Sequence, residues 1–132
     1  MGLHHTNAEL FCPLCEEKLK QAHAELHRWF YDMKEKFPQL HISCSYRGEK
    51  EQNQAVSQGK SKAKYPASAH NKTNEKGEPE ARALDVFELK DGKACFDSDF
   101  YVKLWKNSKQ DFCMIWGGNF KSLGDANHFQ LV

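Results

Sequence analysis

Two histidines and two aspartates supply the side chains that a hydrolytic zinc centre needs: His70, Asp85, Asp125 and His128. Two imidazoles and a carboxylate are common zinc ligands, and three protein ligands leave a fourth tetrahedral position open to water. Asp125 precedes His128 by three residues, so its carboxylate could take a proton from that water. The short segments around them, SAH, ALD and GDANHF, make the set more specific than its residue types alone. The pattern indicates a catalytic zinc site.

Each of these residues also has an ordinary structural explanation. His70 follows a Tyr-Pro pair in an expected loop, where a single histidine is commonly a surface residue. Asp85 interrupts an apolar strand, where a buried carboxylate is costly unless paired or metal-bound; the alternative is the polar face of a half-exposed strand. Asp125 and His128 flank a turn that can bring both side chains into one cleft, or let Asp125 only cap its own backbone.

The hydrophobic pattern predicts the elements that must position these residues. One helix is expected over 13–37, because apolar residues recur at steps of three and four: Leu19, Ala22, Leu26, Trp29, Met33 and Phe37. We also expect helices over 49–58 and 97–110, a loop over 71–82, a turn at Asp91-Gly92, and strands over 40–46, 83–89, 112–116 and 128–132. This order predicts a small α+β domain with a central, mainly antiparallel sheet flanked by helices.

Length and composition favour one globular domain. At 132 residues the chain can bury a single core, so we expect one domain over 1–132, with 1–12 as an N-terminal extension. The hydrophobic fraction of 39%, the charged fraction of 28% and the net charge of +1 give no argument for nucleic-acid or membrane binding, and we expect a monomer. The basic residues between 47 and 64 could meet an anionic substrate or form a solvated loop: Arg47, Lys50, Lys60, Lys62 and Lys64.

Cysteine usage and the N-terminal sequence predict where the protein is made. Five cysteines, an odd number, favour free thiols in a reducing compartment over a disulfide framework. The first residues, MGLHHTNAEL, contain no basic region followed by an apolar stretch, so no signal peptide is visible. No apolar run approaches the ~20 residues of a membrane span. We therefore expect synthesis in the cytoplasm, with another route outward if the target lies outside.

A second possible metal-binding motif lies near the N-terminus. Cys12 and Cys15 form a Cys-x2-Cys pair, and His23 and His27 a His-x3-His pair. The seven residues between the pairs are too few for a zinc finger, and the near-neutral charge speaks against nucleic acid. The four side chains could form a small structural zinc site, but two ordinary thiols and two histidines on a polar helix face are favoured. The remaining cysteines, Cys44, Cys95 and Cys113, are expected in the core.

Several short segments together resemble one peptidase family. The matching segments are SCSYR (43–47), EQNQAVSQGKS (51–61), YPASAHN (65–71), ALDV (83–86), WGG (116–118) and DANHF (125–129). In this order they are similar to the zinc peptidases of the D-Ala-D-Ala carboxypeptidase and L-alanyl-D-glutamate endopeptidase family, many of which are bacteriophage endolysins. The resemblance covers about residues 15–132.

The resemblance implies a fold and a role for each matching residue. The fold would be that of the hedgehog and D-Ala-D-Ala peptidase domains. His70, Asp85 and His128 would bind Zn²⁺, Asp125 would be the general base, and Arg47 would hold the scissile carbonyl or a substrate carboxylate. The alternative for Arg47 is a salt bridge to Glu49 or Glu51. Ser68 and Gln52 would contact substrate in the same cleft, with Gln54 as a substitute for Gln52.

The implied activity is hydrolysis of an amide bond in the peptidoglycan stem peptide, leading to cell lysis. An L-alanyl-D-glutamate endopeptidase is favoured by the phage-like segments, and a D-Ala-D-Ala carboxypeptidase is the alternative within the family. A non-catalytic, zinc-stabilised binding module is the alternative outside it. An enzyme of this kind would act on the bacterial cell wall after holin-type release.

One departure from the family pattern bears on the substrate. In many members the Asp follows the first His by about seven residues, whereas Asp85 follows His70 by fifteen. The longer loop need not disturb the ligands, because extending a loop has a small entropic cost. Since this loop would border the cleft, it leaves the choice of bond open.

Overall fold

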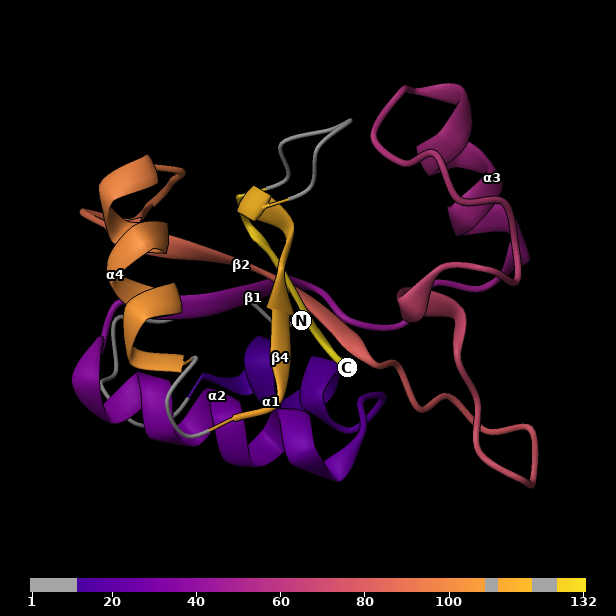
Figure 1. Cartoon of the computed structure of the whole chain (residues 1–132), viewed down its shortest axis with the longest axis horizontal. Coiled ribbons are helices and arrows are strands. Elements are labelled where there is room, and N and C mark those ends of the chain that lie inside the picture. Colours follow the sequence, from indigo (N-terminus) through magenta and orange to yellow (C-terminus); the bar gives the residue numbers. More distant parts are fainter. Residues whose placement is uncertain (1–11, 109–111, 120–125) are drawn as a thin grey trace.

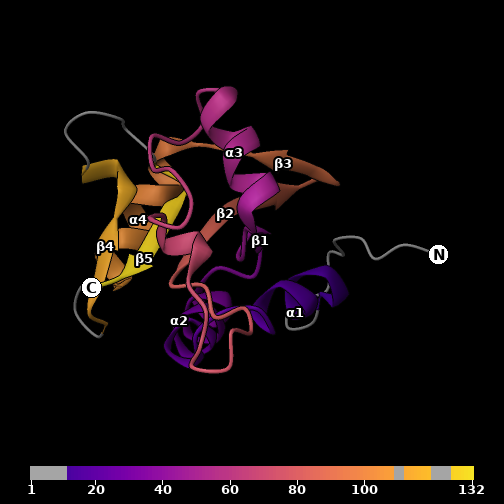
Figure 2. The ribbon, with the colours of Figure 1, turned by 90° about the vertical axis from the view of Figure 1, so that its right-hand side faces the viewer.

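A computed structural model of the chain describes residues 12–108, 112–119 and 126–132. Its elements are α1 (Pro13–Leu19), α2 (Ala24–Lys36), β1 (Leu40–Cys44), α3 (Glu49–Ser57), the 3-10 turn η1 (Ala69–Asn71), β2 (Ala83–Lys90), β3 (Lys93–Cys95), α4 (Ser98–Ser108), β4 (Met114–Trp116), the 3-10 turn η2 (Gly117–Asn119) and β5 (His128–Leu131). Figures 1 and 2 show α1 and α2 on one side of the sheet and α3 on the other. The predicted α+β fold is confirmed.

The sheet is antiparallel throughout its described pairs. Four strands follow the order β1-β2-β5-β4, and β3 pairs with β2 beside this path. The β2–β3 hairpin turns at Asp91 and Gly92, both of which have positive φ, as the Asp-Gly pair predicts. The sequence did not indicate β3, because this strand has only three residues, which are mostly exposed and show no apolar alternation.

The single helix predicted over 13–37 is wrong; the structure has two helices with a break between them. Around the break Ala22 forms a bridge with Ala81, the N–H of His23 donates to the carbonyl of Ala81, and the N–H of Ala81 donates to that of Gln21. His23 then caps α2 by accepting a hydrogen bond from Glu25 N. The apolar spacing could not reveal this break, since the break depends on a residue about sixty positions away.

The hydrophobic core lies between the sheet and the helices α1, α2 and α4. Its fully buried members include Leu26 and Trp29 from α2, Leu104 from α4, and Leu84 and Phe129 from the sheet. The predicted apolar stripe of the N-terminal helices faces this core, with Phe37 partly buried at its end. Cys113 is exposed, so its predicted place in the core is wrong, and Cys44 and Cys95 are only partly buried. No helix among the described residues is long and apolar enough to cross a bilayer.

The outer edge of β1 is closed by side chains of α1 and α2. Edge strands present backbone donors and acceptors that lack a neighbouring strand. Here Ile42 N–H donates to Cys15 Sγ at 3.3 Å, and Lys34 Nζ donates to the carbonyls of Leu40 at 2.8 Å and Pro38 at 2.6 Å. Burial raises the pKa of the Cys15 thiol to about 12. The N–H of Ile42 and the carbonyl of Leu40, both on this edge, therefore have side-chain partners.

Candidate metal centre and substrate cleft

Three adjacent strands place polar side chains in one row across the sheet. Asp85 of β2 lies directly opposite Cys44 of β1 on one side and His128 of β5 on the other. His70 reaches the same place from η1, which is held to the end of β1 because Arg47 N donates to the carbonyl of His70. Residues 44, 70, 85 and 128 are far apart in sequence, and the sheet register brings them together.

The facing atoms of His70, Asp85 and His128 form a compact triangle. His70 Nε2 lies 3.3 Å from His128 Nδ1 and 3.3 Å from Asp85 Oδ1, and His128 Nδ1 lies 3.1 Å from Asp85 Oδ1. A tetrahedral zinc ion with bonds of 2.0–2.2 Å holds two ligand atoms about 3.3–3.6 Å apart. The triangle therefore fits one face of a zinc coordination tetrahedron.

The outward ring nitrogens decide which atoms of the two imidazoles carry protons. His70 Nδ1 lies 2.6 Å from the carbonyl oxygen of Ser45, and His128 Nε2 lies 2.7 Å from Gln130 Oε1. These oxygens only accept, so each outward nitrogen is the N–H donor. When both imidazoles are neutral, each inward nitrogen carries a lone pair, and together with Asp85 Oδ1 these are three acceptors that face one another. Such an arrangement is stable only around a cation, and it has the outer-shell hydrogen bonds typical of metal-bound histidines.

The charge of Asp85 dominates the ionisation of the site. Burial disfavours the carboxylate, but the neighbouring imidazoles of His70 and His128 lower the pKa of Asp85 well below its ordinary range. Burial likewise disfavours protonation of His70, yet the attraction of Asp85 outweighs it and raises the pKa of His70 to about 10. The protein thus provides a buried anion that attracts positive charge, which a proton supplies when no metal is bound.

Cys44 lies against the outer side of this centre. Its Sγ is 3.9 Å from His70 Nδ1, the nitrogen that faces away from Asp85 and His128. Burial disfavours its thiolate, but the hydrogen bond with His70 lowers the pKa of Cys44 below the ordinary value. Because Cys44 and the triangle lie on opposite sides of the same imidazole, we do not count it among the candidate ligands.

Arg47 lies next to the candidate ligands, at the wall of a cavity. Its Nη2 is 3.5 Å from Asp85 Oδ2, and its Nη1 donates to Gln52 Oε1 at 3.2 Å. Its Nε is buried without a hydrogen-bond partner among the described residues. The ion pair is formed with Asp85, and not with Glu49 or Glu51 as the alternative had it. A partly buried cation beside the triangle suits an oxygen that gains negative charge during a reaction.

Gln52 holds Arg47 in place and has no surface for substrate. The side chain is fully buried on α3, and its Oε1 accepts from Arg47 and from Asn71 Nδ2. Its Nε2 donates to Ser61 Oγ at 2.9 Å and to the carbonyl of Ala63 at 2.6 Å. We therefore correct the predicted substrate contact of Gln52 to a positioning role, since both ends of its amide bind protein. Gln54 is exposed on the same helix.

A cavity of about 420 Å³ opens beside the triangle and contains Ser68, His70 and His128 in its wall. Ser68 Oγ accepts from His70 N, so Ser68 shapes the turn that presents His70 as well as lining the cavity. Five basic side chains line the same cavity, and no acidic one does among the described residues: Arg47, Lys60, Lys62, Lys72 and Arg82. The cleft therefore favours anionic ligands.

The structure brings together every predicted site residue that it describes. Asp125 lies outside the described residues, and its role stays a prediction. Gln130 and the carbonyl of Ser45 were not predicted; Gln130 could have been found because it follows His128 by two positions and so shares its face of β5. Lys72 and Arg82 were missed because only the fold brings the two ends of the 71–82 loop to the cleft.

Comparison with known proteins supports the fold and the kind of enzyme. No protein-family model matches the sequence, and no curated protein matches it significantly. Among solved structures, the chain is similar to the crystal structure of ChiX, an L-Ala D-Glu endopeptidase of Serratia marcescens. The TM-score is 0.72 at 25% sequence identity, over 92% of this chain and 89% of that chain. This similarity supports the peptidase family that the sequence motifs indicate.

Proposed function

We propose that this protein is a zinc-dependent peptidoglycan hydrolase that cleaves an amide bond of the stem peptide, with the L-alanyl-D-glutamate bond as the first candidate. The observation behind the proposal is the convergence of three acceptor atoms, from His70, Asp85 and His128, at the spacing of zinc ligands. The similarity to an L-Ala D-Glu endopeptidase over most of both chains supports the substrate class.

In this proposal His70, Asp85 and His128 hold Zn²⁺ through Nε2, Oδ1 and Nδ1. A zinc ion there would lower the pKa of a water molecule and polarise the scissile carbonyl. Ser45 and Gln130 keep the two imidazoles in the tautomers that ligation needs. Asp125 is the proposed general base, which accepts a proton during attack and returns it to the leaving amine.

Arg47 supplies the second positive charge of the reaction. Its partly buried guanidinium lies beside Asp85 and at the wall of the cavity, where it can donate to the carbonyl oxygen as that oxygen becomes negative. The hydrogen bond from Arg47 to Gln52 holds the guanidinium in one orientation. This lowers the free energy needed to reorganise the site during the reaction.

The basic cleft fits a substrate with several carboxylates. Lys60, Lys62, Lys72 and Arg82 line the cavity next to the candidate ligands. Stem peptides contain free carboxylates, so this charge would raise affinity and association rate at low ionic strength. We further propose that the protein acts as a monomer on the bacterial cell wall, after synthesis in the cytoplasm and holin-type release, as a phage endolysin would.

Defined muropeptides test the function and the choice of bond. Purified protein saturated with Zn²⁺ should release L-alanine-terminated and D-glutamate-started fragments, identified by mass spectrometry, and His128→Ala should release neither. Release of D-alanine alone would replace the endopeptidase with the carboxypeptidase. Stoichiometric zinc without any cleavage would reject the enzyme and leave a binding module.

A further inference from the structure

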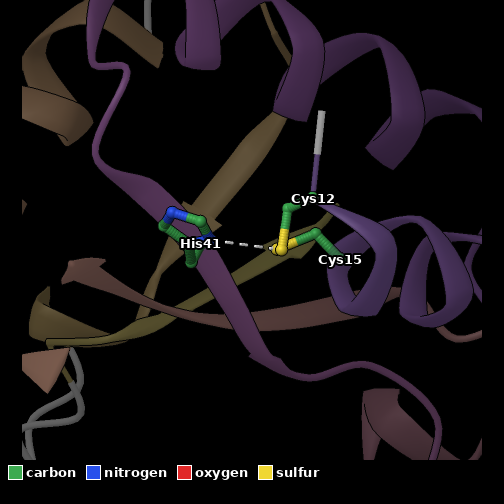
Figure 3. A group of neighbouring side chains, drawn as sticks. All are labelled: Cys12, Cys15 and His41. Atoms are coloured by element: carbon green, nitrogen blue, oxygen red, sulfur yellow. Dashed lines mark hydrogen bonds between the residues drawn. The ribbon is translucent and has the colours of Figure 1, made fainter. Parts of the chain in front are cut away.

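Cys12, Cys15 and His41 form a cluster of metal-binding side chains that shares no residue with the candidate zinc centre. Figure 3 shows the two cysteines at the start of α1 pointing toward His41 of β1. One ligand atom from each residue lies within 4.8 Å of the other two. The three residues are buried, with exposed fractions of 2%, 1% and 1%. The cluster therefore joins the first helix to the edge strand inside the protein.

The structure changes the membership of the N-terminal metal motif. His23 Nδ1 accepts from Glu25 N at the start of α2, and His27 Nε2 bonds to the carbonyl of Ala22. The bonded ring nitrogens of His23 and His27 therefore have partners other than the two cysteines. His41, which is in another element and 26 positions after Cys15, takes the place of that histidine pair. A spacing rule along the sequence could not find it.

The observed geometry suits a thiophilic divalent ion. Cys15 Sγ lies 3.5 Å from His41 Nδ1. A tetrahedral zinc ion with Zn–S of 2.3 Å and Zn–N of about 2.0–2.1 Å places sulfur and nitrogen about 3.6 Å apart. We propose that Cys12, Cys15 and His41 bind a second Zn²⁺, in a structural site that fastens α1 to the edge of β1.

The surroundings fit a structural site rather than a catalytic one. Ile42 N–H already donates to Cys15 Sγ, as outer-shell amides do toward metal-bound thiolates. Binding would release the thiol protons of Cys12 and Cys15 to solvent and leave the metal with two thiolates and a neutral imidazole. The competing arrangement is a metal-free hydrogen-bond chain, in which Lys34 Nζ, 3.5 Å from His41 Nε2, and Cys15 share the imidazole. The two arrangements differ in whether sulfur touches a metal.

Cobalt substitution separates the two arrangements. The full chain is freed of metal, loaded with two equivalents of Co²⁺ and examined for sulfur-to-cobalt charge transfer in the near ultraviolet. The catalytic triangle has nitrogen and oxygen donors only, so this absorption reports the second site alone. We expect it in the unchanged protein and in His70→Ala, at equal intensity, and expect it to be lost in Cys15→Ser. Cys113→Ser is the matched control, because Cys113 is exposed.

Zinc content gives the second, independent measurement. Two zinc ions per chain are expected, one in His70→Ala, one in Cys12→Ser and two in Cys113→Ser. Peptidoglycan cleavage is not used as the readout, so failure of the second site and failure of the enzyme remain distinguishable. If a cysteine variant does not fold, thiol titration of the unchanged protein decides: zinc should protect two thiols that chelation exposes to slow modification. One zinc in the unchanged protein with none in His70→Ala, or no charge transfer in His70→Ala, would overturn the proposal.

Discussion

Replacing Gln130 should weaken zinc binding although Gln130 is not a ligand. Its Oε1 accepts from His128 Nε2 at 2.7 Å, and this bond keeps the lone pair of His128 on Nδ1, facing Asp85 and His70. Gln130→Ala removes the acceptor. Losses of outer-shell partners typically reduce metal affinity 10- to 100-fold, or about 1.4–2.7 kcal/mol. We expect the upper part of this range, since only 9% of the His128 side chain is exposed and water replaces the lost acceptor poorly.

The assay is competition for Zn²⁺ with a chromophoric chelator at fixed pH. Gln130→Glu is the matched control, because its carboxylate oxygen can accept the same hydrogen bond and should keep the affinity of the unchanged protein. Far-ultraviolet circular dichroism checks that β5 still forms. Equal dissociation constants for Gln130→Ala and the unchanged protein would refute the tautomer argument. Equal weakening in both variants would show that the amide group acts in some other way.

Three further changes test other parts of the site and its support. Gln52→Leu should lower kcat at least tenfold with zinc content unchanged, because Arg47 loses its neutral anchor; Gln52→Glu, which keeps the acceptor, should recover part of the rate. Asp125→Ala should abolish turnover while the protein still binds one equivalent of zinc at the catalytic centre, and parallel loss of that metal would instead make Asp125 a ligand. Gly118→Ala should lower the free energy of unfolding by about 1–3 kcal/mol, seen as a lower Tm, because a Cβ there would overlap the ring of Trp116.

The sequence predicts the parts of the fold that depend on local pattern. The apolar run around Asp85 and the Asp-Gly pair after it correctly predicted a strand and a turn, because both signals come from neighbouring residues. The break at Ala22 was missed, because it depends on a backbone pairing with Ala81. Local signals describe an element well when its partners are close in the chain.

For the candidate site too, local sequence predicts some features and the fold determines the others. The identities of His70, Asp85 and His128 could be proposed from their short segments, yet their meeting depends on the β2–β5 register and on η1 docking to β1. Two of the side-chain roles that the sequence did not reveal are Gln52 as a support and His41 as a partner of Cys15. Both come from contacts across long loops or between elements. Residue types suggest the chemistry, and the fold decides which residues share it.

The closure of the β1 edge by Cys15 and Lys34 has a consequence for solubility. If α1 detaches, or a reagent alkylates Cys15, the outward N–H of Ile42 loses its acceptor and the strand edge becomes available to another chain. Thiol damage in this protein would then appear first as strand-to-strand association between molecules, at the edge of β1 that Cys15 contacts. Protecting the buried sulfur of Cys15 from modification would prevent this association.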